Sequence, residues 1–409
     1  MTGSDGTSTS RQWVDGEGAI GLTIRLLLLW CAGASLRLTV LALPPVLDEI
    51  TAAFRLGSTD VGVLTAIPPF VFAAGALPGA VLIQRSSALT CLLVGLGLTA
   101  SGAAGRGFVG GPLALEIATG VMCAGVAIMQ PAMPALVRGW AARHIGLASA
   151  TYTFGLLVGE IAPVVWPLQR PIMGLESGWQ SQLLAWSLPV AATAVAIAAF
   201  RPTVGSRSPK TPAASPWPDW SGREVWWVGM LMGSVGAAYL GLNGFIPAWL
   251  RHNGDASAIG TALIALNVAQ LPAVILMLKF AERLAFAIWA YIVAGALLLL
   301  GAVLLAIGPA ALVPIAASMA GFCSAVLLSL VITLQPLVAT DETVPALSAG
   351  TFAVGFAIAG VVATLTGLLG TTGMAWLGVV PIAAACLTIV AVGSKVDRLR
   401  PDTRSQEGG

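Results

Sequence analysis

The stretch GLASATYTFGLLVG at residues 146–159 returns as ALSAGTFAVGFAIA at residues 346–359, 200 positions further along the chain. Both copies are apolar and contain the small residues that suit tightly packed membrane helices. At this shift the identical pairs are Leu147 and Leu347, Thr151 and Thr351, and Gly155 and Gly355. A second set, shifted by 198, pairs Gly62 with Gly260 and Arg85 with Arg283. Several matches at nearly one shift predict that a single structural unit occurs twice.

The composition identifies the class of protein in which this unit occurs. Of the 409 residues, 9% are Asp, Glu, Lys or Arg and 57% are hydrophobic, and the mean hydropathy is +0.89. Soluble domains carry about 25% charged residues, so a soluble globular enzyme and a disordered chain are both excluded. The net charge of +2 gives no support to nucleic-acid binding. The composition therefore predicts a polytopic membrane protein.

Apolar runs of about 20 residues are long enough to cross a bilayer as helices. These runs are continuous rather than alternating, which favours helices over a closed barrel. Twelve such runs are predicted, at residues 22–43, 60–83, 88–105, 112–136, 145–168, 180–200, 224–249, 257–279, 284–307, 310–334, 345–369 and 373–393. The predicted fold class is therefore an all-α membrane protein with twelve transmembrane helices in two six-helix repeats.

The distribution of Lys and Arg predicts the orientation. With the N-terminus inside, fifteen of these residues fall on the cytoplasmic side and four outside, which is the bias expected for cytoplasmic termini. The domains follow as a disordered cytoplasmic tail (1–21), an N-terminal half (22–200), a Pro- and Ser-rich cytoplasmic linker (201–223), a C-terminal half (224–393) and a cytoplasmic tail (394–409). We expect a monomer in the inner (plasma) membrane.

Arg37 is a charged residue inside the first predicted span. It lies about 15 residues from the start of that span, roughly 22 Å from the cytoplasmic end at 1.5 Å per residue. An arginine at this depth costs at least ~2.5–3.5 kcal/mol and needs a partner or an aqueous cavity. We interpret Arg37 as an anchor for an anionic or strongly polar substrate, because guanidinium offers a planar set of donors. The alternative is a structural arginine that snorkels or binds helix carbonyls.

Glu160 lies about 15 residues into the fifth predicted span, which runs in the same direction as the first. Glu160 and Arg37 are therefore expected at similar depth and form a candidate ion pair. Burial favours the protonated carboxyl and a nearby cation favours the ionised one, so Glu160 is the candidate for proton coupling. A purely structural pair between the two spans is the alternative.

Uncharged polar side chains within the spans complete the set of candidates. Trp30 shares the helical face of Arg37. Buried amides often serve only as hydrogen bonds between helices. The remaining candidates are Gln130, Tyr239, Asn243, Asn267, Gln270, Ser324 and Gln335. The five cysteines lie in apolar runs and the two histidines in separate polar loops, so no metal and no cofactor is expected.

Several of these stretches resemble one family. They are LWCAGASLRLTVLALPPVLDEI (29–50), MQPAMPALVRGW (129–140), GLNGFIPAWL (241–250), ALNVAQLPAVIL (265–276) and ALSAGTFAVGFAIAG (346–360). They are similar to the cyanate permease and 2-nitroimidazole transporter family of the major facilitator superfamily. The resemblance implies two parallel six-helix repeats with a substrate site between them, and Arg37 at the family's charged position. It also favours Gln130, Tyr239 and Asn243 as substrate-binding residues, by analogy of fold.

The sequence thus predicts a secondary active transporter of a small anionic or polar organic solute, working by alternating access and coupled to protons through Glu160. Its partners would be a small-molecule substrate and the bilayer. Two alternatives stay open. One is efflux of neutral or hydrophobic compounds with a structural Arg37. The other is a membrane-embedded enzyme, for which no catalytic constellation is visible in the sequence.

Overall fold

The computed structural model describes residues 6–165, 178–200, 215, 217–340, 342–370 and 375–400. Within these residues the chain is helical, with short 3-10 turns and no strands. The first half contains α1 (Gly6–Leu38), α2 (Leu47–Phe54), α3 (Ser58–Arg85), α4 (Ala88–Gly105), α5 (Pro112–Met129), α6 (Ala132–Trp140), α7 (Ile145–Val165) and α8 (Trp179–Ala199). The second half contains α9 (Arg223–His252), α10 (Ile259–Val268), α11 (Gln270–Leu284), α12 (Ile288–Ile307), α13 (Val313–Val338), α14 (Val344–Gly370) and α15 (Val379–Gly393).

The twelve predicted spans are confirmed in the described part of the chain. Twelve segments there are long and apolar enough to cross a membrane, and they run from Gly21–Leu38 to Trp376–Gly393. Each begins and ends within about seven residues of its predicted bounds, and the largest difference is at the start of the second span, Ile67 against residue 60. The chain is therefore an all-α protein with twelve candidate membrane helices.

Two of the spans are interrupted. The fourth consists of α5 and α6, which meet at Gln130 and Pro131, and the eighth consists of α10 and α11, which meet at Ala269. Proline removes a backbone donor and pushes against the preceding turn, which explains a break at Pro131 and just before Pro272. Because backbone groups freed inside a membrane need new partners, such breaks persist where polar groups or a cavity are close by.

The first span ends earlier than predicted, and the helix that contains it begins well before the span. It was expected over 22–43, but α1 ends at Leu38, ahead of the Pro44–Pro45 pair, which disfavours helix in the residues before it. Arg37 therefore lies in the last turn of α1. At the other end, α1 already begins at Gly6, where a disordered tail was predicted. Extending a formed helix adds one hydrogen bond per ordered residue and avoids a new nucleus, which lets α1 run on beyond the span.

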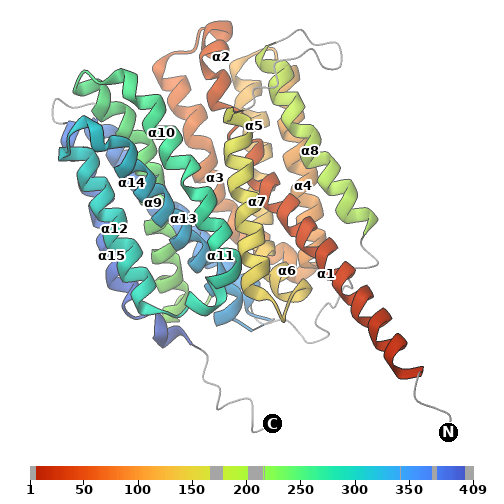
Figure 1. Ribbon diagram of the computed structural model, residues 1–409. Helices are drawn as coiled ribbons and strands as arrows, with labels where there is room; N and C mark the ends of the chain where they lie inside the picture. Colours follow the sequence, from red (N-terminus) through yellow and green to blue (C-terminus); the bar gives the residue numbers. More distant parts are fainter. Residues whose placement is uncertain are drawn as a thin grey trace.

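The helices form two groups that lie side by side, the N-terminal group in red to yellow and the C-terminal group in green to blue (Figure 1). Each group has its own buried apolar core. The two repeat copies occupy corresponding places, since α7 packs against α1 and α14 packs against α9. Gly155 permits the first approach, because a Cβ atom there would lie 2.1 Å from the Trp30 backbone oxygen. Small residues thus set the helix spacing inside each group.

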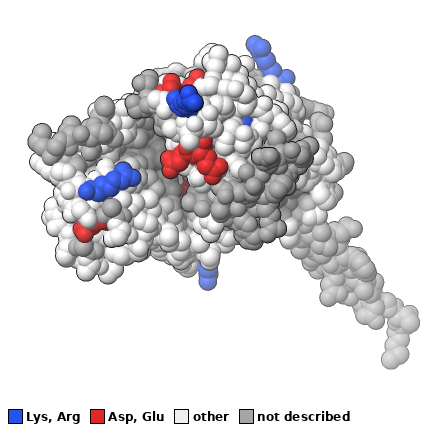
Figure 2. Space-filling model, turned by 90° about the horizontal axis from the view of Figure 1, so that it is seen from above, with Lys and Arg blue, Asp and Glu red and all other residues white. Residues whose placement is uncertain are grey.

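Both described chain ends lie at one end of the bundle (Figure 1). At this end the two groups are hydrogen-bonded to each other, since Arg138 Nη1 donates to the Pro336 carbonyl and the Gly146 backbone N–H donates to Glu282 Oε2 at 3.0 Å. The opposite end is hollowed between two lobes, with charged side chains of both signs around the hollow (Figure 2). The molecule is closed at the end of the termini and open at the other.

The predicted linker and tail lie partly outside the described residues, which omit 201–214, 216 and 401–409. The described start of the tail is packed rather than extended. Val396 and Leu399 are buried in the core of the second group, and Arg223 Nη2 donates to the Arg398 carbonyl at 3.2 Å. The chain after α15 therefore folds back onto its own half.

Candidate functional site

Arg37 and Glu160 form an ion pair between α1 and α7. Arg37 Nε lies 3.3 Å from Glu160 Oε1, and the two side chains are 24% and 15% exposed. The close packing of the two helices explains the pairing, because Gly33 and Gly155 let the backbones approach. The expectation of similar depth is thus met by direct contact. The partial exposure of both side chains means that solvent reaches the pair.

The pair lies in the wall of a cavity between the two helix groups. The cavity has an empty volume of about 340 Å³, which includes space open to solvent. Its lining combines polar groups from the first half with apolar and aromatic groups from both. The lining residues are Leu36, Arg37, Gln130, Tyr152, Leu156, Glu160, Met232, Leu328, Ile332, Phe352 and Phe356. A few polar groups in an apolar cavity are typical of a small-molecule site.

The second half provides aromatic rings to this cavity. Phe352 and Phe356 are stacked one helical turn apart on α14, with ring centroids 6.0 Å apart, and Phe72 of α3 lies 5.2 Å from Phe356. The Phe72–Phe356 contact thus joins an aromatic ring of the first half to one of the second half. The cavity lining therefore includes charged side chains from α1 and α7 and aromatic rings from α14.

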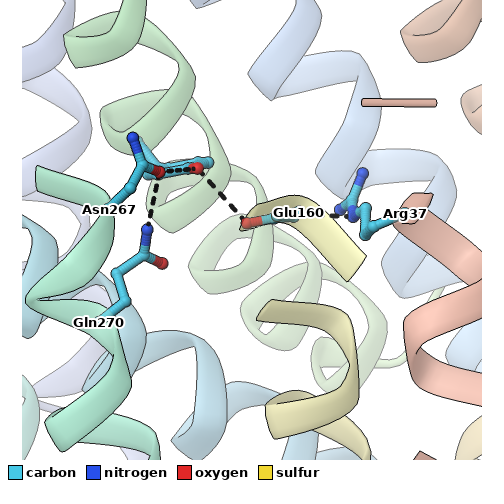
Figure 3. A network of polar contacts seen from close by, with 5 residues as sticks. Arg37, Glu160, Asn267 and Gln270 are labelled. Carbon is cyan, nitrogen blue, oxygen red and sulfur yellow. Dashed lines mark hydrogen bonds and ion pairs between the residues drawn. The ribbon is translucent and has the colours of Figure 1, made fainter. Parts of the chain in front are cut away.

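A chain of polar contacts continues from Glu160 into the second half. Tyr239 Oη of α9 lies 3.3 Å from Glu160 Oε2 and 2.8 Å from Asn267 Oδ1, and Gln270 Nε2 lies 3.2 Å from the same Asn267 oxygen. Figure 3 shows Glu160 between Arg37 on one side and the Asn267 and Gln270 side chains on the other. The break between α10 and α11 places Asn267 and Gln270 in this chain. Polar residues beside Pro272 in an apolar run were the signal for them in the sequence.

Of the other predicted site residues, some line the cavity and some do not. Gln130 lines the cavity at the break between α5 and α6, and its Oε1 is buried without a hydrogen-bond partner among the described residues. Trp30 and Asn243 are not part of the lining. The Trp30 ring packs 6.4 Å from Phe154, and Asn243 Nδ2 donates to the Tyr239 carbonyl of its own helix at 2.9 Å.

Arg106 is one of the four Lys and Arg residues that the charge distribution predicts outside, and the structure buries it. It is fully buried in the turn after α4, and its Nη2 donates to the Thr39 carbonyl at 2.7 Å, just beyond the end of α1. A cation at the end of a helix stabilises the free carbonyls and the negative end of the helix dipole. Arg106 therefore supports the turn that follows Arg37. The sequence around Arg106, a Gly-rich turn between two spans, did not predict that this side chain would be buried.

Comparison with known proteins extends these findings. No family model matches the chain. The 2-nitroimidazole transporter of Escherichia coli (strain K12) is 25% identical over 246 residues, which cover 60% of this chain and 61% of that transporter. The alignment thus spans less than two thirds of the relative.

Solved structures match over almost the whole chain. The major facilitator superfamily transporter FucP in its outward conformation superposes with a TM-score of 0.71 at 12% identity, over 94% of this chain and 100% of FucP. The proton:xylose symporter XylE, bound to 6-bromo-6-deoxy-D-glucose, gives a TM-score of 0.68 at 12% identity, over 94% and 96% of the two chains. At these identities the likeness concerns the fold. The chain has the twelve-helix fold of the major facilitator superfamily transporters, and in sequence it resembles the 2-nitroimidazole transporter.

Proposed function

We propose that this protein is a secondary active transporter of a small anionic or polar organic solute, which works by alternating access. The observation that carries the proposal is the Arg37–Glu160 pair in a cavity between two helix groups. Rocking of the two groups would expose such a cavity to one side of the membrane at a time. The closed end near the termini and the hollow at the opposite end are consistent with one state of that cycle.

The cavity chemistry supports a compact solute with a planar anionic or polar group. Among the described residues, Arg37 has Glu160 as its polar partner, through Nε. Its two terminal nitrogens are then available to a ligand, and guanidinium binds planar anions through two parallel donors. Gln130 adds an amide whose Oε1 has no hydrogen-bond partner among the described residues, and the aromatic rings of α14 would hold an unsaturated body.

Proton coupling is assigned to Glu160 in this proposal. A carboxyl that pairs with Arg37 when ionised would release it when protonated, and so change the charge that a substrate meets. The names of the structural neighbours fit this assignment, since FucP and XylE are both described as proton symporters. The E. coli relative is named for 2-nitroimidazole, a small planar solute. We place the protein in the plasma membrane as a monomer with cytoplasmic termini.

Uptake into proteoliposomes tests the proposal. Radiolabelled cyanate, bicarbonate and 2-nitroimidazole would be offered with and without an inward proton gradient. We expect gradient-driven uptake of at least one, its loss in Arg37→Ala, and loss of the gradient dependence in Glu160→Gln. Arg251→Ala removes an exposed arginine at the end of α9 and serves as the matched control. Full uptake by the Arg37 variant would disprove the role of an anion anchor.

A second candidate is transport of neutral or hydrophobic compounds, with a structural Arg37–Glu160 pair. The apolar and aromatic majority of the lining favours it. The same variants separate the two candidates. A neutral-compound transporter would keep its flux in the double variant Arg37→Ala/Glu160→Gln, in which the pair is replaced by uncharged groups.

A further inference from the structure

Tyr152 is a cavity residue whose hydroxyl has no partner within the described part of the protein. The residue lies on α7, lines the cavity and is 2% exposed. No hydrogen bond to Tyr152 Oη forms among the described residues, and this oxygen is not one of the side-chain atoms that are sealed from solvent without a partner. A buried phenol normally finds a hydrogen-bond partner. The hydroxyl is therefore accessible from the cavity, where a ligand can bind it.

The packing of α1 against α7 holds the Tyr152 ring in place. A Cβ atom at Gly33 would lie 3.0 Å from Tyr152 Cδ2 and closer still to the Tyr152 backbone oxygen. Glycine at this position therefore makes room for the ring, one helical turn before Arg37. Because the ring packs directly on the backbone of α1, the place of its hydroxyl is set before a ligand arrives. A group fixed in this way loses little freedom when it binds a ligand.

Tyr152 and Glu160 lie toward opposite ends of the cavity. The helix α7 begins at the closed end, where Gly146 binds Glu282. Tyr152 follows Gly146 by six residues and Glu160 follows it by fourteen, which is about 9 Å and about 21 Å along the helix. Leu156 lines the cavity between the two. Long helical side chains lean toward the N-terminus of their helix, which takes the Tyr152 ring further from Glu160.

The inner end of the cavity lies next to the contacts that close the molecule. Ile332 of α13 lines the cavity one helical turn before Pro336, whose carbonyl accepts from Arg138. Tyr152 therefore brings a hydroxyl to the inner end, where it shares the lining with an apolar side chain. Arg37 lies toward the other end with its carboxylate partner, and it still acts electrostatically on Tyr152. One ligand of moderate length can thus contact both side chains.

We propose that Tyr152 is a specificity-determining residue, which binds a second polar group of the substrate at the inner end of the cavity. This inference rests on the proposed function and narrows its substrate class. The solute places an anionic group at Arg37, an unsaturated body beside Phe352 and Phe356, and a hydrogen-bonding group at Tyr152. The hydroxyl both donates and accepts, so that group is a hydroxyl, a carbonyl or a ring nitrogen. A triatomic anion is too short for both ends and binds at Arg37 alone, since Tyr152 and Glu160 lie about 12 Å apart along α7.

Equilibrium binding to the purified full-length protein in detergent tests the inference. Isothermal titration calorimetry compares 4-hydroxybenzoate, which has a polar group at each end, with benzoate, which has one, and with cyanate, which has no ring. We expect 4-hydroxybenzoate to bind about three- to tenfold more tightly than benzoate, as one added hydrogen bond allows. Tyr152→Phe should remove this preference and leave the affinities for benzoate and cyanate unchanged. Tyr291→Phe is the matched control and should keep the preference, because Tyr291 Oη donates to the Ala285 carbonyl and the residue does not line the cavity.

A preference for 4-hydroxybenzoate that survives in Tyr152→Phe would overturn the proposal, and so would its absence in the unmodified protein or an equal loss of cyanate binding in the variant. Because the hydroxyl has no partner among the described residues, Tyr152→Phe should also keep the melting temperature of the unliganded protein. A variant that melts clearly earlier or does not fold would assign the hydroxyl to stability and overturn the proposal as well.

The binding measurement needs no transport, so the two proposals fail separately. A preference that depends on Tyr152, without uptake of any solute into proteoliposomes, would refute the transport proposal alone. Uptake that depends on Arg37, with an unchanged preference in Tyr152→Phe, would refute the role of Tyr152 alone.

Discussion

The two helix groups share the same helix packing, but they differ in the charged side chains that they bring to the cavity. At the shift of 200, Gly155 and Gly355 occupy the same place, each on a helix that packs against the first helix of its own group. Glu160, five residues further on, corresponds to Gly360. The second half faces the site with the neutral side chains of Tyr239 and Asn267 instead. The repeat thus fixes helix packing in both halves, while charge is confined to the cavity wall of the first.

The largest effect is expected from removing the positive charge of the first half. Arg37→Ala leaves Glu160 partly buried without its cation. Breaking a fully buried pair costs about 3–5 kcal/mol, and the partial exposure of this pair reduces the loss in unfolding free energy to roughly 2–3 kcal/mol.

Adding Glu160→Gln should restore most of that stability, since no charge is then left unpaired. Thermal unfolding of the single and double variants in one detergent measures the difference. Equal losses in the single and double variants would show that the stability depends on packing of the arginine stem instead.

The shared glycines allow a direct comparison of the two halves. A Cβ atom at Gly155 would lie 2.1 Å from a backbone oxygen, whereas one at Gly355 would lie 3.0 Å from Cγ of the flexible Met232 side chain. Gly155→Ala should therefore destabilise by roughly 1–3 kcal/mol or more. Gly355→Ala should be near neutral, because alanine gains about 1 kcal/mol of helix propensity.

Melting temperatures of the two variants provide the measurement, and Gly97→Ala, where a Cβ would meet nothing within 4 Å, is the control. If Gly355→Ala proved as damaging as Gly155→Ala, the two halves would be equally close-packed at this position.

A smaller effect is expected at the closed end. Glu282 accepts from the Gly146 backbone N–H at the start of α7, where a negative charge also favours the helix dipole. Its counterpart at the shift of 198 is the uncharged Gln84. Glu282→Ala should weaken closure by about 0.5–1 kcal/mol and raise labelling of a cysteine introduced at this end roughly two- to fivefold.

Glu224→Ala, which removes an exposed carboxylate on α9, should leave the labelling rate unchanged. A rate in Glu282→Ala equal to that of this control would mean that the contact does not hold the end closed.

The smallest effect is expected at Asn243. Its amide donates within α9, and the residue does not line the cavity. Asn243→Ala should change the initial uptake rate less than twofold. A tenfold loss at unchanged protein level would place Asn243 in contact with the substrate in another state of the cycle.

The sequence by itself determined the class and most of the fold. Hydropathy gave twelve spans, because a membrane requires about 20 apolar residues per helix whatever the neighbours are. The same reasoning picked out Arg37 and Glu160, since charge within a span is costly and stands out. The repeat divided the chain into two halves, with both of these residues in the first half.

Only the tertiary structure decided which side chains meet. The Arg37–Glu160 contact depends on how closely α1 and α7 pack, and the contact of Tyr239 with Glu160 depends on how the two halves lie against each other. It also left Trp30, Tyr239 and Asn243 out of the cavity lining and buried Arg106. Spans are local properties of the chain, which hydropathy records. Contacts between residues tens of positions apart arise from packing, for which a single sequence carries no local signal.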